Sequence, residues 1–172
     1  MTWKLDPTHT QIQFSVRHMM ISNVRGTFQK YEAEATIDPS AIGKSKVVAK
    51  VEAASINTGE PQRDAHLKSA DFFDADNFPH LTLESTKVTT SGDEITIDAN
   101  LTIKDITKPV QLKGEVLGPH KDPWGNQRIG FSVSGELERE AFGLSWNQAL
   151  EAGGVLVGKK VKINLDAEFV QS

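Results

Sequence analysis

The side chains whose spacing suggests chemistry lie in one stretch, RDAHLKSADFFDAD, which begins at residue 63. It combines Arg63, His66 and four aspartates. Neighbouring carboxylates beside a histidine can transfer protons, so Asp71, Asp74 and Asp76 are candidates for acid–base chemistry with His66. The same run is interrupted by phenylalanines. It therefore also fits a loop whose aromatic rings plug an apolar interior while its carboxylates face water.

No complete catalytic or metal-binding motif accompanies these groups. The sequence lacks the G-x-S-x-G and H-E-x-x-H spacings, and it has no cysteine for a thiolate nucleophile, a zinc ligand or a disulfide. His9 and His18 would have to meet His66 or His80 in space to form a metal site. We predict no catalytic residues, no metal and no catalytic cofactor.

Three other side chains are candidates for contact with a ligand. His18 shares the strand parity of Phe14 and Val16, so its polar tip ends an apolar row, where it would meet a head group or a backbone carbonyl. The Arg63 guanidinium suits a diphosphate or a polar ring; alternatively it anchors a helix. Trp146, which precedes Gly153-Gly154, either lines a pore mouth or closes the core, and Trp124 is expected to pack within its loop.

The elements that must position these groups are amphipathic strands. Apolar and polar residues alternate with period two in about eight segments, which indicates antiparallel strands with one buried face. The regular segments are 11–17, 95–103, 110–116, 128–137 and 161–169, and less regular strand candidates lie near 24–37, 46–55 and 80–90. The stretch from Gly59 to Phe73 lacks this alternation, and Pro61 lies near its start, so we expect a short helical insertion near residues 60–74.

Eight such strands predict one all-β domain over residues 1–172. An antiparallel barrel solves the problem of exposed sheet edges, and a sandwich is the alternative. Gly26, Gly114 and Gly135 fall inside strands and suggest bulges or bends. The predicted inward rows contain Phe14, Val16, Phe28, Ile97, Leu101, Leu112, Phe131, Val133, Ile163 and Leu165.

Composition excludes several functions. A net charge of −4 and a pI near 5.7 argue against nucleic acid, and the short cluster Lys159, Lys160 and Lys162 is typical of a solvated edge. No apolar run reaches the length of a membrane span. The N-terminal residues lack the apolar core of a signal peptide, so a cytoplasmic protein is expected. A periplasmic protein whose leader had been replaced by Met1 would have the same sequence.

Several segments together resemble the YceI-like family of polyisoprenoid-binding proteins over nearly the whole chain. The most specific is RDxHLxSxDFFD from Arg63, followed by Phe78-Pro79. The others are WxLDxxHT from Trp3, FSVxH from Phe14, VxGxF from Val24, NTG from Asn57, NLTI from Asn100, TKPV from Thr107 and FGL from Phe142. The resemblance implies a lipocalin-like barrel whose elongated apolar pore holds a polyprenyl diphosphate or an isoprenoid quinone.

Three functions therefore compete. The first is a binding module that sequesters or carries an isoprenoid lipid, with His18, Arg63, Trp146 and the inward rows as contacts. The second is a small hydrolase or isomerase that acts on an apolar substrate through His18, His66 or the aspartates. The third is a barrel with a solid core and no ligand. We favour the first, and a homodimer is compatible with it.

Overall fold

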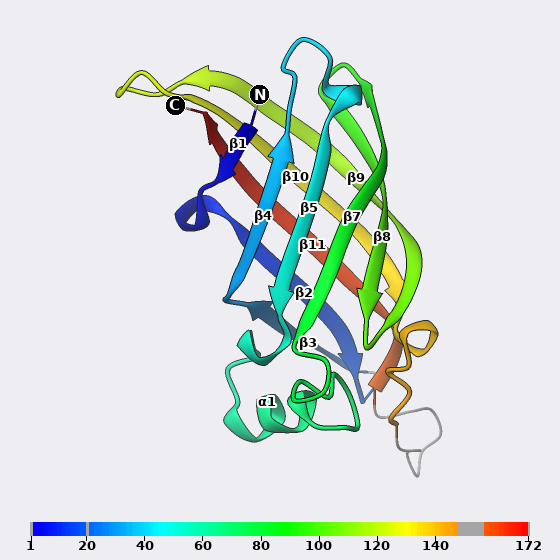
Figure 1. Cartoon of the computed structure of the whole chain (residues 1–172). Coiled ribbons are helices and arrows are strands. Elements are labelled where there is room, and N and C mark those ends of the chain that lie inside the picture. The colour runs from blue at the N-terminus through cyan, green and yellow to red at the C-terminus, as the bar shows by residue number, and fades with distance from the viewer. Residues whose placement is uncertain (1, 20, 148–156, 172) are drawn as a thin grey trace.

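The fold is built almost entirely from β-strands (Figure 1). The computed structural model describes residues 2–19, 21–147 and 157–171. Within them the strands are β1 (Thr2–Leu5), β2 (Gln11–His18), β3 (Ser22–Phe28), β4 (Tyr31–Thr36), β5 (Lys46–Glu52), β6 (Ile56–Asn57), β7 (His80–Ser91), β8 (Glu94–Ile103), β9 (Ile106–Lys121), β10 (Gln127–Glu138) and β11 (Val157–Gln171). The helical elements are α1 (Pro61–Lys68) and the 3-10 turns η1 (Pro7–His9), η2 (Ile42–Lys44), η3 (Ala53–Ser55) and η4 (Arg139–Phe142).

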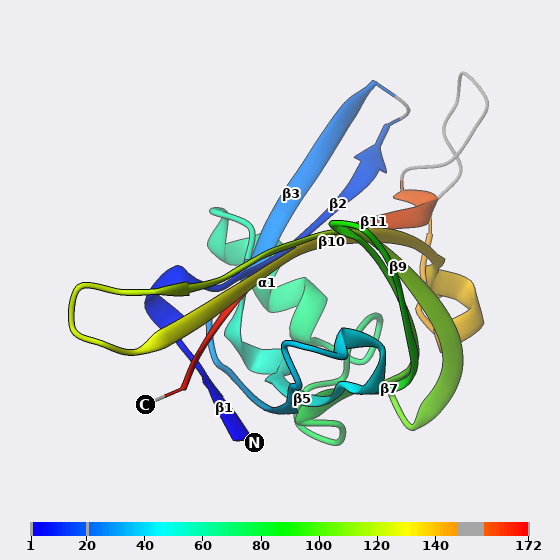
Figure 2. The ribbon, with the colours of Figure 1, turned by 90° about the horizontal axis from the view of Figure 1, so that it is seen from above.

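Eight of these strands close into an antiparallel barrel, as the sequence predicts. Hydrogen bonding runs in the order β1-β4-β5-β7-β8-β9-β10-β11, and β11 pairs with β1 to complete the ring (Figures 1 and 2). Each of these pairings is antiparallel. Closure leaves the ring without a free edge. The predicted segment 11–17 forms β2, outside this ring, and the short strand β1, which the alternation did not predict, takes the eighth place.

One edge of β11 is shared between two strands. Phe169 and Val170 pair with β1, and the stretch from Asp166 to Val157 pairs with β2. The short segment 6–10, which contains η1, carries the chain from β1 to β2. The β2–β3 hairpin extends away from the ring (Figure 2), and β3 pairs on its other side with β6 at only two positions, Thr27 and Phe28.

The glycines predicted to form bulges have another role. The strand registers are regular at Gly26, Gly114 and Gly135, and the irregularities lie elsewhere, near Ser85, Arg128 and Val157. A Cβ atom at Gly114 would collide with the carbonyl oxygen of Ser132, and one at Gly135 with that of Gln111. These glycines therefore permit close approach of neighbouring backbones in β9 and β10.

Inward side chains form two buried clusters, one around Phe28, Ile97 and Leu112 and the other around Trp3 and Phe169. The helix α1 begins where the Glu60 carboxylate accepts hydrogen bonds from two backbone N–H groups, with Pro61 in the first turn. It lies across one end of the barrel (Figure 1), and turns follow it to residue 77. None of the helices in the described residues is long and apolar enough to span a membrane.

Candidate functional site

The barrel interior contains two adjoining cavities. The α1 cavity, at the end of the barrel that α1 covers, has a volume of about 280 Å³. The β1 cavity, toward the opposite end, has a volume of about 120 Å³. Both are lined by Ile12, Ala49, Leu83 and Leu165, so the two cavities meet end to end at these residues. The bore is therefore not a fully packed core.

The predicted contact residues all lie on the walls of this bore. The α1 cavity is lined by Phe14, Val16, His18, Phe28, Arg63, Leu101, Trp146, Ile163 and Leu165. The β1 cavity is lined by Ile97, Leu112, Phe131, Val133 and again Leu165. For the residues on strands, period two predicted the inner face of the barrel, whereas Arg63 lies on α1 and Trp146 in the segment after η4. That they touch a ligand stays a prediction.

Aromatic rings gather at the α1 end of the bore. The imidazole of His66 packs edge-on against Trp146 and Phe72, with ring centroids 4.7 and 5.1 Å apart. Phe73, also on the cavity wall, packs against Phe28 at 5.8 Å. Asp71 is exposed. Asp76 is exposed as well, whereas Asp74 is half-buried and accepts from Asn77, so the structure agrees with a plug of aromatic rings whose carboxylates face water at Asp71 and Asp76. Trp146 lies on the cavity wall; Gly153-Gly154 lie outside the described residues.

Arg63 and Asp64 join α1 to β6. The Arg63 guanidinium donates to the Oγ1 and the carbonyl oxygen of Thr58 at 2.7 and 2.8 Å, and the Asp64 carboxylate accepts from the backbone N–H of Thr58 at 2.9 Å. These contacts support the anchoring alternative for Arg63. Because its side chain also lines the α1 cavity, a second contact with a ligand remains compatible with the geometry.

Arg139 lines the α1 cavity and is missing from the sequence-based predictions. It is 3% exposed, and its guanidinium donates to the carbonyl oxygens of Leu144, Trp146, Val157 and Gly158. Burial lowers its pKa. The sequence did indicate that Arg139 points inward, because it lies two residues after Leu137 and continues the alternation of that inward-facing row. The arginine ties the segment after η4 to the start of β11 and so fixes the wall that carries Trp146.

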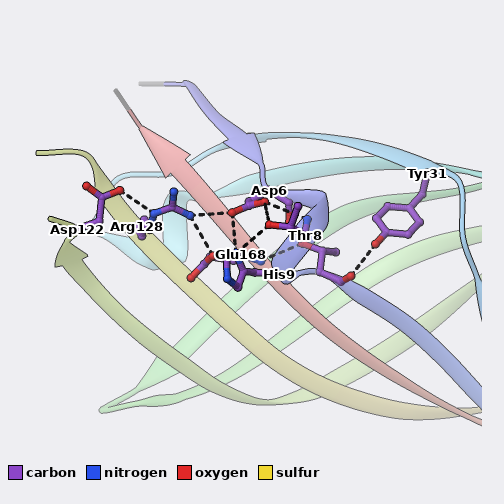
Figure 3. Close-up of polar contacts among 8 residues, drawn as sticks. Asp6, Thr8, His9, Tyr31, Asp122, Arg128 and Glu168 are labelled. Carbon is purple, nitrogen blue, oxygen red and sulfur yellow. Dashed lines mark hydrogen bonds and ion pairs between the residues drawn. The ribbon is translucent and has the colours of Figure 1, made fainter. Parts of the chain in front are cut away.

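A network of charged groups holds the segment 6–10 against the barrel (Figure 3). Arg128 of β10 donates to Asp6 at 2.8 Å, to Glu168 at 3.2 Å and to Asp122 at 2.8 Å. His9 bonds to the same Asp6 oxygen at 2.8 Å and lies 3.1 Å from Glu168. Leu5, which precedes the segment, and Thr10, its last residue, line the β1 cavity, so the network positions one part of that cavity's wall.

Three members of this network have the composition of a metal site. Ligand atoms of Asp6, His9 and Glu168 all lie within 4.8 Å of one another. The Arg128 guanidinium bonds to both carboxylates and supplies the positive charge that a cation would otherwise provide. Of the histidines that sequence reasoning considered together, His9 lies in this network, whereas His18 and His66 both line the α1 cavity. Neither of these two belongs to a group of three possible ligands within the described residues.

We predict that His9 gives stability a pH dependence. Hydrogen bonding to Asp6 and the nearby Glu168 raise the pKa of His9, so its contribution is complete below its ordinary pKa of 6.5 and is lost as pH rises through the raised value. Urea unfolding at about pH 6 and about pH 9 should show the decline, and His9→Gln should flatten it. The control is His80→Gln on β7, which should retain the slope; an equal slope in both variants would contradict the prediction.

The Asp6 carboxyl in the same network gives stability a pH dependence of the opposite sign. Hydrogen bonds from Thr8, from His9 and from Arg128 lower its pKa well below the ordinary range. Its contribution is therefore present above its ordinary pKa and is lost as pH falls through the lowered value. The network therefore contributes most to stability at pH values between the lowered pKa of Asp6 and the raised pKa of His9.

A closed antiparallel barrel around an apolar bore defines a class of proteins that enclose slim ligands. The model described as the YceI-like domain matches residues 3–169, and the chain belongs to this family. A UPF0312 protein of Staphylococcus aureus is 39% identical over 95% of this chain and 94% of its own. The Campylobacter jejuni YCEI protein is 28% identical, with a TM-score of 0.75 over 91% of this chain and 90% of its own.

Two more distant structures show the same fold. BcnA of Burkholderia cenocepacia has a TM-score of 0.81 at 19% identity over 95% of this chain and 98% of its own. A polyisoprenoid-binding domain from Saccharophagus degradans has a TM-score of 0.67 at 12% identity over 97% of each chain. The names of the Staphylococcus aureus and Campylobacter jejuni relatives describe no reaction.

The groups that an enzyme would need are only partly assembled. His66 and Asp71 form a pair at 2.9 Å, and His66 lines the α1 cavity. The contacts described for the His66 ring are Asp71, Phe72 and Trp146, and none of these is a hydroxyl group that the imidazole could activate for attack. Asp74 bonds to Asn77 instead of joining the pair. The acidic run therefore does not converge on one reacting centre.

Proposed function

We propose that this protein binds a long-chain isoprenoid lipid inside the barrel and sequesters or carries it. The observation that carries the proposal is the pair of adjoining cavities, whose shared wall at Ala49 and Leu83 would let one linear chain extend from one into the other. Membership of the YceI-like family supports it. The relation of fold to the polyisoprenoid-binding domain of Saccharophagus degradans agrees with it.

The bore matches such a chain in its chemistry. At ~0.8 kcal/mol per buried CH₂, about 15 methylene equivalents would contribute roughly 12 kcal/mol before the entropy losses of binding. Micromolar or tighter affinity is compatible with that figure. A branched, flexible chain also tolerates an irregular wall of Phe, Leu, Ile and Val.

The head group would lie at the α1 end. The side chains there that can form polar contacts are those of His18, Arg63, His66, Thr82, Arg139 and Trp146. A polyprenyl diphosphate would meet the guanidinium of Arg63, and an isoprenoid quinone would accept a hydrogen bond from an imidazole. Both head groups are therefore candidates, with the tail directed toward the β1 cavity.

Uptake measurements would test the proposal and separate binding from catalysis. Delipidated protein is mixed with an isoprenoid quinone or a polyprenyl diphosphate, and both the bound fraction and the chemical identity of the recovered lipid are measured. We expect saturable uptake of one molecule per chain and recovery of unchanged lipid. Conversion into a product that depends on His66 and Asp71 would support the enzyme alternative, and absence of uptake would contradict the proposal.

A further inference from the structure

The end of the β2–β3 hairpin is apolar and exposed. Ile21 is 82% exposed and Met19 is 44% exposed, and both are among the most exposed large hydrophobic residues described. The turn is held by a hydrogen bond from the backbone N–H of Ile21 to the carbonyl oxygen of His18 at 3.2 Å. The hairpin projects beyond the barrel (Figure 2), so these side chains are presented outward.

Positive charge accompanies this apolar end. The chain has a net charge of −4, yet the sequence from residue 7 to residue 31 contains no Asp or Glu and includes Arg17 and Arg25. In the register, Arg25 lies opposite Ser15, and Ser15 lies opposite Lys162, so Arg25 and Lys162 share the outer face of β3-β2-β11. Neither arginine forms an ion pair within the described part of the chain.

The same hairpin forms part of the cavity wall on its inner face. Val16, His18 and Val24 line the α1 cavity, together with Val157 at the start of β11. The edge of β3 from Ser22 to Gly26 has no strand partner apart from β2 within the described residues. The apolar, basic end of the hairpin is thus the exposed continuation of the wall that encloses the α1 cavity.

We propose that the β2–β3 hairpin docks on the surface of a bilayer that contains anionic lipids. Met19 and Ile21 would enter the region between head groups and acyl chains, and Arg17, Arg25 and Lys162 would face the lipid phosphates. A second copy of the chain fits less well, because it would bring the same three positive charges of both copies together. The docking would place the α1 cavity beside the bilayer, which is the source and destination of an isoprenoid.

Flotation with vesicles that contain no isoprenoid tests the docking apart from the proposed function. We expect the protein to float with vesicles of phosphatidylglycerol and phosphatidylcholine and to bind pure phosphatidylcholine at least about tenfold less. Met19→Ser combined with Ile21→Ser should reduce binding to the mixed vesicles about tenfold or more. The matched control is Trp124→Ser, which removes a 79% exposed aromatic from the hairpin at the other end of the barrel.

A second pair of variants tests the charge. Arg17→Gln with Arg25→Gln should abolish the preference for anionic vesicles, and Lys50→Gln with Lys108→Gln, which removes two exposed lysines elsewhere, should preserve it. Absence of flotation, an equal loss in Trp124→Ser, or a homodimer that dissociates on Ile21→Ser would overturn the proposal. Vesicle binding by a protein that takes up no isoprenoid would count against the proposed function alone.

Discussion

Replacement of Ala49 by phenylalanine should weaken the binding of a long isoprenoid about 200-fold while the barrel stays folded. Ala49 lies on β5 and lines both cavities where they meet. A benzyl group there would block the passage and exclude the ligand from the β1 cavity. If that cavity holds roughly four carbon atoms of the tail at ~0.8 kcal/mol each, the loss is about 3 kcal/mol.

Chain length gives this prediction a second readout. An isoprenoid short enough to occupy the α1 cavity alone should bind Ala49→Phe nearly as tightly as the unmodified protein. The matched control is Val48→Phe, because Val48 is the neighbouring residue of β5 and is 50% exposed, so its side chain faces solvent. Equal affinity of Ala49→Phe and Val48→Phe for a long isoprenoid would contradict a chain that spans both cavities.

Arg139→Met should lower the free energy of unfolding by about 3–5 kcal/mol. The substitution removes a 3% exposed guanidinium and leaves the carbonyl oxygens of Leu144, Trp146 and Gly158 without this donor, while that of Val157 keeps its second donor, Asn147 Nδ2. A buried acceptor that loses its partner retains its desolvation penalty. Urea denaturation should show a midpoint about 1.5 M lower.

Two further variants show whether the hydrogen bonds of Arg139 are responsible. Arg139→Lys retains the charge but cannot reach all four carbonyls with one ammonium group, so its stability should fall between that of the Arg139→Met variant and that of the unmodified protein. Arg25→Met, which removes an exposed arginine, should change the free energy of unfolding by less than about 0.5 kcal/mol. If Arg139→Met unfolded like Arg25→Met, the guanidinium would not hold this part of the wall.

Local patterns predicted the parts of the structure that depend on nearest neighbours. Alternation from Ile95 to Ile103 identified β8 and its inner face, and the rows around Phe131 and Ile163 did the same for β10 and β11. The strand-borne part of the bore wall follows from this parity. Alternation did not show that the stretch 24–37 divides into β3 and β4. It also did not reveal the four-residue strand β1, although the pairing of β1 with β11 closes the ring.

Local sequence patterns could not predict contacts between residues that are far apart in the chain. Arg128 meets Asp6 across 122 positions, and no spacing rule relates the two. The prediction for Trp124 was wrong for a physical reason: the residue lies in a tight turn in which Asp122 accepts hydrogen bonds from the backbone N–H groups of Trp124 and Asn126, so the turn needs no aromatic packing and the ring is 79% exposed. Parity similarly indicates an inward Arg139 but not the carbonyls that it binds.

Native mass spectrometry of the freshly purified protein, followed by extraction of the bound material into organic solvent, would show whether the barrel holds an isoprenoid. We expect one isoprenoid per chain, and the mass of the extract would identify both the head group and the length of the tail. A protein that carries no lipid and also takes up neither added isoprenoid quinone nor polyprenyl diphosphate would contradict the proposed function.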